Sequence, residues 1–288
     1  MAREAIGPCD ETGRIRLDLD GVKGYGVPES PQFILSERQR DTITIWLNHP
    51  ERLNVLSLAL MEELTQAFLA AGESDATGVM LAAKGRLFSA GHDFAEMANQ
   101  DLESVQNLFG VCTTLMQTIQ SIPQPVVARV HGLATGGGCQ LVATADLAVA
   151  SHDASFCTPG GKGGLFCTTP MVAVGRSIGR KRALEMAMTG DAIDARTAES
   201  WGLINLAVPI SELEDASVRL LRRATRGSSG SKGIGKHAFY EQIEMEQTDA
   251  YAYATDVMAA ASLTPDAQES IAAFIEKRPP NFAAPSPT

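Results

Sequence analysis

Two short segments carry small residues where an apolar run ends, and both could take part in chemistry. The first is residues 88–93, FSAGHD, and the second is residues 132–140, GLATGGGCQ. A backbone N–H points into a cavity only where no side chain blocks it, so a glycine-rich turn that opens a helix suits the stabilisation of developing negative charge. We therefore expect the N–H groups of His92 and Gly137 to converge on one carbonyl oxygen, as two halves of an oxyanion site.

The same glycines have a structural alternative, because residues 136–138 would also let a helix pack closely against its neighbours. Each segment alone favours that alternative. The two together favour a site, since losing one oxyanion donor typically costs about 3–4 kcal/mol of transition-state stabilisation. A phosphate site fits less well, because the turn lacks a P-loop lysine and three adjacent glycines do not match a dinucleotide fingerprint.

Strands and helices are expected to alternate around both turns. Apolar or alternating runs predict strands at residues 42–47, 78–83, 125–130 and 146–150. Ser57 and Asp101 stand where they would cap helices that run to residues 71 and 121, and a third helix opens at the glycine turn. This alternation predicts an α/β fold of stacked βαβ units, with both glycine segments at the same edge of a sheet layer.

Four regions follow from the pattern along the chain. Residues 1–31 are glycine-rich and poorly periodic, which predicts a loose N-terminal extension. Residues 32–209 carry the alternating strands and helices and the candidate site. Helical patterns dominate residues 210–278, where Ser211 and Glu214 have capping-box spacing, and residues 279–288 are expected to form a frayed tail.

The composition excludes several classes of function. With 24 Lys and Arg against 34 Asp and Glu, the net charge of −10 argues against a nucleic-acid surface. No apolar run reaches the roughly 18 residues of a membrane span, and residues 1–30 lack the apolar segment of a secretory signal. Five cysteines without CxxC spacing fit reduced thiols. We therefore expect a cytoplasmic protein without a nucleic-acid, membrane or metal partner.

Four segments in order along the chain resemble the crotonase, or enoyl-CoA hydratase/isomerase, superfamily. They are residues 50–56 (PERLNVL), residues 88–97 (FSAGHDFAEM), the glycine turn followed by Asp146, and residues 274–282 (FIEKRPPNF). Together they span roughly residues 32–282. Residues 137–149, 155–160 and 164–170 are similar more narrowly to the enoyl-CoA hydratase domain-containing protein 3 subgroup.

The resemblance implies a crotonase (ClpP/crotonase-like) spiral of ββα units with a C-terminal helical region that forms a homotrimer or a dimer of trimers. It implies an acyl-CoA thioester as ligand, with coenzyme A as part of the substrate and no separate cofactor, and the mitochondrial matrix as the location in a eukaryote. His92 and Gly137 would hold the thioester oxygen. The other substrate-binding residues that the resemblance implies are Arg52, Ala90, Asp93, Phe94, Gly160, Phe274 and Lys277, the last with a solvated helix-end lysine as the alternative.

The chain departs from this family at both acid/base positions. Hydratases of this type use two glutamates to position and deprotonate water and to protonate the α-carbon, and this sequence has Gln140 and Gly160 there. An amide cannot act as a base near neutral pH, and glycine has no side chain. General acid–base assistance contributes about 10²–10⁴-fold, so the sequence predicts binding with slow hydration. A Gln140→Glu, Gly160→Glu double variant that gained hydration would support an inherited geometry.

Three functional hypotheses remain open. The first is an acyl-CoA-binding enzyme classed with the enoyl-CoA hydratases of fatty acyl-CoA metabolism, with ordinary hydratase turnover in doubt. The second is decarboxylation or other enolate chemistry without a carboxylate base, for which His92 resembles the histidine of crotonase-type decarboxylases, although its ring could simply pack at the rim. The third is a non-catalytic acyl-CoA binder.

Two further features have a functional and a structural explanation. Cys139, Cys157 and Cys167 could cluster near the site, but buried cysteine is commonly a small core residue, and no partner base for a nucleophile is evident. Lys162, in a glycine-rich loop, could meet a substrate carboxylate or be a solvated surface lysine.

Overall fold

The computed structural model describes residues 33–282 of the 288-residue chain. The predicted extension at residues 1–31 and residues 283–288 of the predicted tail lie outside the described residues.

A six-stranded sheet forms the centre of the fold, in the order β1-β2-β3-β4-β6-β9. Its strands are β1 (Ile34–Gln39), β2 (Thr42–Leu47), β3 (Gly78–Ala83), β4 (Val126–Val130), β6 (Leu147–Ser151) and β9 (Leu206–Val208). β1 and β2 are antiparallel, and every other neighbouring pair is parallel. Because β3 and β4 run the same way, the two glycine segments that follow them leave the sheet at the same edge.

A smaller sheet lies beside the second glycine segment, in the order β5-β7-β8. It contains β5 (Ala134–Thr135), β7 (Ser155–Cys157) and β8 (Ile193–Asp194). The sequence analysis predicted none of these three short strands. β5 pairs in parallel with β7 and leads directly into the glycine turn, so this sheet fixes the direction from which the turn approaches its helix.

Helices cover both faces of the central sheet. Along β3, Val79 and Leu81 belong to one apolar cluster and Met80 to another, because successive strand residues point to opposite faces. The first cluster is covered by α1 (Leu58–Glu73), α2 (Leu102–Ser121) and α3 (Gly137–Thr144). The second is covered by α7 (Leu213–Ala224), which packs against β3, β4 and β6.

The predicted caps of α1 and α2 are confirmed. The Ser57 side chain accepts from the N–H of Leu60 at 3.3 Å, and Asp101 accepts from the N–H of Ser104 at 2.8 Å. The predicted capping box at Ser211 is wrong. Ser211 lies inside a 3₁₀ turn (Ile210–Glu212), and α7 begins without a side-chain cap, because the preceding turn already runs into the helix.

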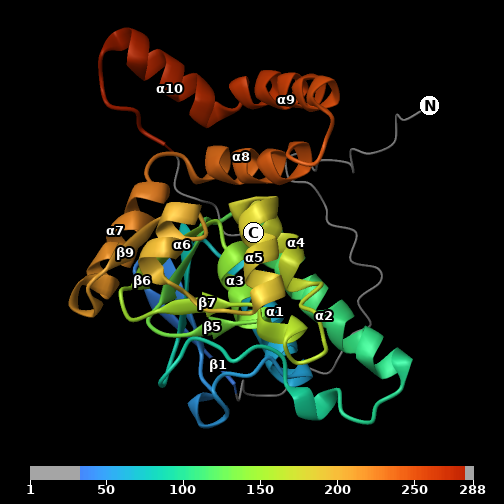
Figure 1. Ribbon diagram of the computed structural model, residues 1–288. Coiled ribbons are helices and arrows are strands. Elements are labelled where there is room, and N and C mark those ends of the chain that lie inside the picture. The colour runs from blue at the N-terminus through green and yellow to red at the C-terminus, as the bar shows by residue number, and fades with distance from the viewer. Residues whose placement is uncertain (1–32, 283–288) are drawn as a thin grey trace. The chain divides into compact units, whose positions relative to one another are not determined.

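The remaining helices follow in chain order. They are α4 (Pro170–Ile178), α5 (Arg180–Thr189), α6 (Ala195–Trp201), α8 (Ser229–Gln242), α9 (Gln247–Ser262) and α10 (Pro265–Glu276). Figure 1 shows α8, α9 and α10, in orange to red, gathered together at one side, and α10 contacts both of the others. α3 packs against α4, which packs against α5.

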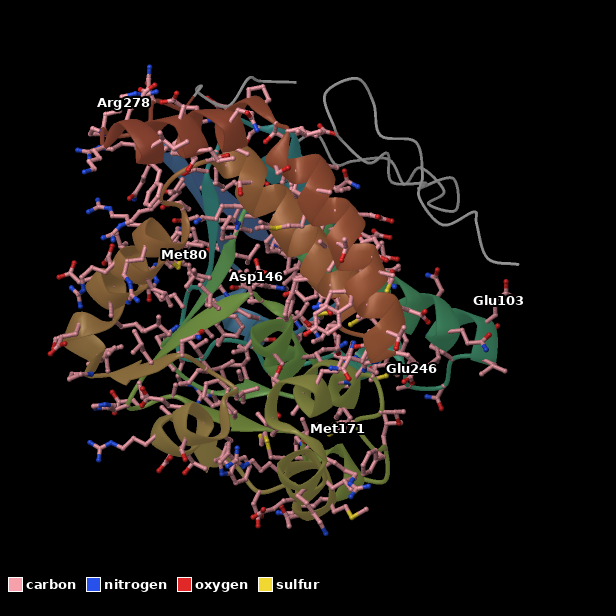
Figure 2. All side chains as sticks on the ribbon, turned by 90° about the horizontal axis from the view of Figure 1, so that it is seen from above. Met80, Glu103, Asp146, Met171, Glu246 and Arg278 are labelled. Atoms are coloured by element: carbon pink, nitrogen blue, oxygen red, sulfur yellow. The ribbon has the colours of Figure 1, made fainter. Side chains whose placement is uncertain are left out.

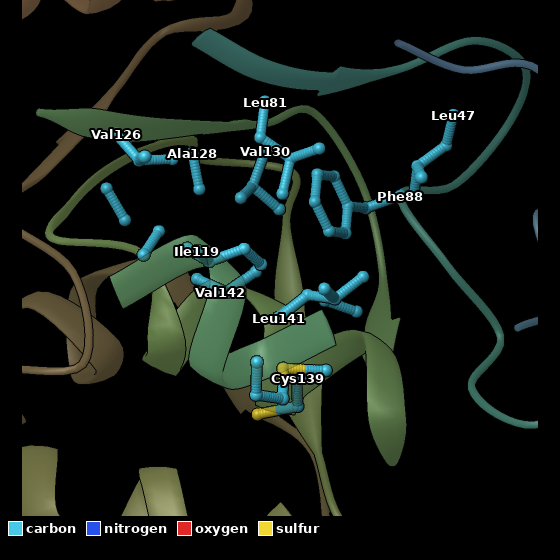
Figure 3. Close-up of a cluster of buried hydrophobic side chains, with 14 of the residues drawn as sticks. Leu47, Leu81, Phe88, Ile119, Val126, Ala128, Val130, Cys139, Leu141 and Val142 are labelled. Atoms are coloured by element: carbon cyan, nitrogen blue, oxygen red, sulfur yellow. The ribbon is translucent and has the colours of Figure 1, made fainter. Parts of the chain in front are cut away.

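The main apolar core lies directly beneath the second glycine segment. Figure 3 shows Phe88, Val130, Cys139 and Leu141 converging in it, so residues from both glycine segments share one core. Phe88, Cys139 and Leu141 are fully buried. The turns that carry the candidate site are therefore anchored on a rigid support.

Candidate active site

The first turn, residues 88–93, is held from below by Asn54 and Ser89. The Asn54 amide donates to the carbonyls of Lys84 at 2.8 Å and Phe88 at 3.2 Å. The Ser89 hydroxyl donates to the Asn54 carbonyl at 2.8 Å and accepts from the N–H of Gly91 at 3.2 Å. Gly91 has a φ of 81°, which favours glycine. This network fixes the backbone on both sides of His92.

Both turns require glycine where they touch each other. A Cβ atom at residue 91 would lie 2.7 Å from the Thr135 carbonyl oxygen and 3.2 Å from the Gly137 nitrogen. A Cβ atom at residue 138 would lie 2.7 Å from the Cβ and from the carbonyl oxygen of Ser89. The two explanations for the glycines are therefore not exclusive, since close packing is what brings the two turns together.

The N–H groups of His92 and Gly137 have no acceptor within residues 33–282. Leu56 donates to the Gly91 carbonyl at 2.8 Å and accepts from the N–H of Asp93 at 3.3 Å, so the intervening N–H of His92 points away from Leu56. Gly137 is the first residue of α3, where N–H groups have no intrahelical acceptor and the helix dipole is positive. Two free donors therefore stand on adjoining turns.

The His92 ring is mostly buried between the second turn and α2. A Cβ atom at residue 137 would lie 3.0 Å from its Cε1, and the ring meets Phe109 edge-on with centroids 5.2 Å apart. Its Nε2 is buried and has no hydrogen-bond partner within the described chain. Burial lowers the pKa of His92 to about 4, so the ring is neutral at pH 7.

Gln140 and Gly160, at the two positions where the resemblance implies acid/base glutamates, have different surroundings. Gln140 lies one turn into α3, is 4% exposed, and its Oε1 accepts from the thiol of Cys112 at 3.8 Å. Gly160 lies in a 3₁₀ turn (Pro159–Gly161), and its N–H donates to the Cys167 sulfur at 3.3 Å. A Cβ atom at residue 160 would overlap the carbonyl oxygen of Leu165. Neither position holds a carboxylate.

Three thiols lie close enough to influence one another. Burial raises the pKa of Cys139, with smaller contributions from Cys157 and Cys167. Burial also raises the pKa of Cys157, whose sulfur donates to the Thr135 hydroxyl at 3.2 Å, and that of Cys167. All three thiols remain protonated near neutral pH, so the core-packing explanation holds better than a nucleophile.

Arg52, Asp93 and Phe94 lie on the rim of the first turn. The Arg52 guanidinium pairs with the Asp93 carboxylate at 2.8 Å, and Asp93 also accepts from the N–H of Ala95 at 3.0 Å. Phe94 is 72% exposed. Ala90 is half-buried, and its N–H donates to the Leu53 carbonyl at 3.0 Å. The structure thus gathers all four residues beside His92, and Asp93 braces the turn.

Phe274 and Lys277 do not share this rim. Phe274 is 86% exposed on α10, which packs against α8 and α9, and Lys277 ends that helix with a φ of 56°. Lys162 pairs with Asp191 at 2.5 Å on the surface, in keeping with the surface-lysine explanation. Lys162 thus has a partner of its own outside the two turns.

The contacts that α2 makes with the site were not predicted from the sequence. Phe109 contacts the His92 ring and Cys112 contacts Gln140, three residues apart on one face of the helix. That spacing indicates a shared helix face, but not which residues the face meets. Glu62 on α1 was not predicted either. Its Oε1 is buried without a partner within residues 33–282, and burial, followed by the nearby Glu96, raises its pKa.

A pocket of about 300 Å³ lies elsewhere, between α8 and the sheet. Lys236 donates to Asp146 at 2.8 Å and to the carbonyls of Ile119 and Gln124, and the Tyr240 hydroxyl donates to Asp146 at 2.8 Å. Figure 2 shows Asp146 beneath the α8 layer. Because these polar groups satisfy one another, the pocket marks a structural junction.

No group of three His, Cys, Asp or Glu side chains within residues 33–282 could hold a metal ion. None of the helices in the same range is both long and apolar enough to cross a bilayer.

Known proteins resemble the chain over most of its length. Residues 37–285 match the family described as Enoyl-CoA hydratase/isomerase. The chain is 43% identical to the mitochondrial enoyl-CoA hydratase domain-containing protein 3 of Rattus norvegicus, over 88% of this chain and 85% of that protein. The fold is similar to that of a Mycobacterium smegmatis enoyl-CoA hydratase, with a TM-score of 0.84, 42% identity, and coverage of 87% and 99%. Human enoyl Coenzyme A hydratase domain-containing protein 3 gives a TM-score of 0.84 at 38% identity, with coverage of 87% and 100%.

Proposed function

Because the chain belongs to the enoyl-CoA hydratase/isomerase family, we propose that it binds an acyl-CoA thioester and stabilises a thioester enolate or oxyanion. Family membership confirms the predicted resemblance and the α/β spiral of ββα units. The observation that carries the proposal is the contact between two glycine turns, each with one unpaired N–H donor, at His92 and Gly137.

The chemistry follows from what surrounds these donors. As negative charge develops on a thioester oxygen, two fixed N–H groups stabilise it without reorganising, and burial strengthens the interaction. Proton transfer has no equivalent support. Gln140 offers an amide and Gly160 offers no side chain. No carboxylate at these positions can therefore deprotonate water or protonate the α-carbon. Under this proposal the protein polarises thioesters well and hydrates enoyl groups slowly.

Calorimetric binding of CoA thioesters and single-turnover hydration of crotonyl-CoA test this proposal together. Binding with hydration at least about 10²-fold below the enzyme range of 1–10³ s⁻¹ is the expected result. Hydration within about tenfold of an efficient enzyme would overturn the argument from the missing glutamates. Failure to bind any CoA thioester would overturn the proposal as a whole.

Decarboxylation is the second candidate, and the buried His92 ring is the observation that favours it. In this reaction the bond between Cα and the carboxylate breaks, CO₂ leaves, and the electron pair forms an enolate that water then protonates. No base is needed. A carboxylate beside the neutral ring and Phe109 is poorly solvated, which raises its free energy relative to the enolate. Turnover of malonyl-type but not crotonyl-type thioesters would favour this candidate, whereas binding without turnover would favour a non-catalytic binder.

Assembly and location remain proposals. Large apolar side chains stay exposed on α9 and α10, including Met258 at 75% and Leu263, between the two helices, at 76%. These support a homotrimer or a dimer of trimers, in which Phe274 and Lys277 would reach the nucleotide of a neighbouring subunit. The location, cytoplasmic or in the mitochondrial matrix of a eukaryote, stays a prediction, as does the absence of a separate cofactor.

A further inference from the structure

The contact between Cys112 and Gln140 fixes how the Gln140 amide is turned. The two side chains are almost fully buried, and the Cys112 sulfur lies 3.8 Å from Oε1 of Gln140. Burial raises the pKa of Cys112 to about 12, so the thiol keeps its proton and acts as a donor. A donor pairs with the amide oxygen and would oppose the amide NH₂ group. The thiol therefore pairs with the side-chain oxygen of Gln140 and leaves the amide NH₂ group on the other side of the amide plane.

The amide nitrogen of Gln140 is left free. It has no acceptor within residues 33–282, and it is not among the fully buried atoms that lack a partner, so it retains contact with open space. Gln140 stands three residues after Gly137 on one face of α3, about 4.5 Å further along the axis. Gln140 thus follows Gly137 by about one helical turn along α3.

The same face of α2 controls both polar side chains of the site. Phe109 contacts the His92 ring, and Cys112, one turn later, contacts Gln140. α2 packs on α3 and on α1, so its position is set by the core. Figure 1 shows the N-terminal end of α2, in green, extending away from the sheet and the other helices. The orientation of Gln140 is therefore built into the packing of two helices.

The charges at this place favour a neutral acceptor. His92, Gln140 and Cys112 are all uncharged at pH 7, and the nearby guanidinium of Arg52 is already paired with Asp93. A carboxylate placed beside the Gln140 amide would lose water without gaining a cation. A carbonyl oxygen needs only the hydrogen bond.

We propose that Cys112 is a positioning residue that holds the Nε2 of Gln140 toward the acyl group, so that the site selects thioesters with a carbonyl oxygen on the third carbon. The inference rests on the proposed function. With the thioester oxygen at Gly137, a 3-oxoacyl group carries its second oxygen in the direction of the next helical turn, where Gln140 donates.

The test compares acetoacetyl-CoA with butyryl-CoA, which have equal chain length and differ at the third carbon. Calorimetric titration of the full chain is expected to give a Kd about tenfold lower for acetoacetyl-CoA, the fold-change that one neutral hydrogen bond of about 1.4 kcal/mol produces. Cys112→Ala should reduce this ratio to about threefold or less. Cys112→Ser, which keeps a donor at the same place, should restore it.

Met116→Ala is the matched control. Met116 lies one turn further along α2, and its sulfur accepts from the Thr144 hydroxyl of α3 at 3.2 Å, so the variant loosens the same helix pair without touching Gln140. It should leave the ratio unchanged. If Cys112→Ala does not fold, Gln140→Met removes the same donor and should abolish the ratio.

Each result decides the inference. Equal affinities for the two thioesters in the unmodified protein, or a ratio that survives Cys112→Ala or Gln140→Met, would overturn it while leaving the proposed function intact. The same is true if Met116→Ala lowers the ratio as much as Cys112→Ala does. Binding of neither thioester would overturn the proposed function, and the inference with it.

Discussion

The carbonyl oxygen of Leu165 occupies the space into which any side chain at Gly160 would have to project. The loop is held in this position by its own backbone, because the N–H of Leu165 donates to the Gly160 carbonyl at 2.9 Å and the N–H of Gly160 donates to Cys167 at 3.3 Å. The difference from a hydratase at this position is therefore more than the absence of a glutamate side chain. The whole turn has a shape that excludes it.

A Gln140→Glu, Gly160→Glu double variant is consequently expected not to gain hydration, contrary to what an inherited geometry would predict. The new side chain must displace the loop at residues 160–167, at a cost of about 1–3 kcal/mol of folding free energy for overpacking. Urea unfolding measures the loss, and single-turnover hydration of crotonyl-CoA measures the chemistry. A variant that hydrates at least about tenfold faster than the unmodified protein would contradict this.

Gly163→Ala serves as the control in the same loop. A Cβ atom at residue 163 would meet only the Gly160 carbonyl oxygen, at an ordinary 3.7 Å. Its effect on unfolding free energy should stay within about 0.5 kcal/mol. An equally large loss in both variants would mean that the loop as a whole is intolerant, and not that Leu165 blocks residue 160.

The buried His92 makes stability depend on pH. Its pKa is about 4 in the folded chain against 6.5 as the ordinary value, so between these pH values the unfolded chain binds one proton more. The contribution is complete above pH 6.5 and is lost as the pH falls toward 4, by about 3 kcal/mol in all. Urea unfolding at several pH values should show this loss in the unmodified protein and not in His92→Gln.

His152 provides a matched histidine for comparison. It is exposed just after β6, and the one hydrogen bond of its ring among the described residues joins Nε2 to the Ala207 carbonyl at 3.2 Å. His152→Gln should retain the pH dependence of the unmodified protein. If His92→Gln retains it as well, the acid sensitivity originates in other groups.

The elements that carry the site were predictable where the signal is local. β3 is buried at all six positions, so its apolar run needs no partner to be recognised. The Ser57 and Asp101 caps act within three residues, and their side chains fix where α1 and α2 begin. β1 was missed because five of its six residues are exposed or polar, and only pairing with β2 makes it a strand.

The chemistry of the site was predictable only in part. The backbone donors follow from glycine spacing, because parallel strands bring both turns to one edge. The contact between Cys112 and Gln140 joins residues 28 apart on two helices, and no periodicity encodes which faces meet. The folded loop at residues 160–167 is glycine-rich and lacks a pattern altogether. Such tertiary contacts depend on how side chains pack and not on the secondary-structure propensity of each residue.

The apolar surface of α9 and α10 predicts association of the chain with itself. Met258 on α9 is 75% exposed, and a glutamate there would oppose burial of this face in an assembly. Met258→Glu is expected to raise the dissociation constant of the assembly at least about tenfold, measured by light scattering over a range of concentrations. Asp256→Ser, an exposed change on the same helix, should have no such effect. A mass unaffected by Met258→Glu would remove this face as the interface.

The junction of Asp146, Lys236 and Tyr240 should determine how firmly α8 is attached to the sheet. The Lys236 side chain is only 8% exposed, and burial lowers its pKa while Asp146 opposes the shift. Lys236→Met leaves Asp146 without its cation and is expected to cost about 3–5 kcal/mol in urea unfolding, because a buried charge then stands unpaired. Tyr240→Phe removes one bond to a carboxylate and should cost about 1.5–3 kcal/mol. Lys232→Met, one turn earlier on α8, should change stability by no more than about 0.5 kcal/mol. Similar losses for both lysines would show that the α8 surface as a whole, and not the buried pair, holds the helix in place.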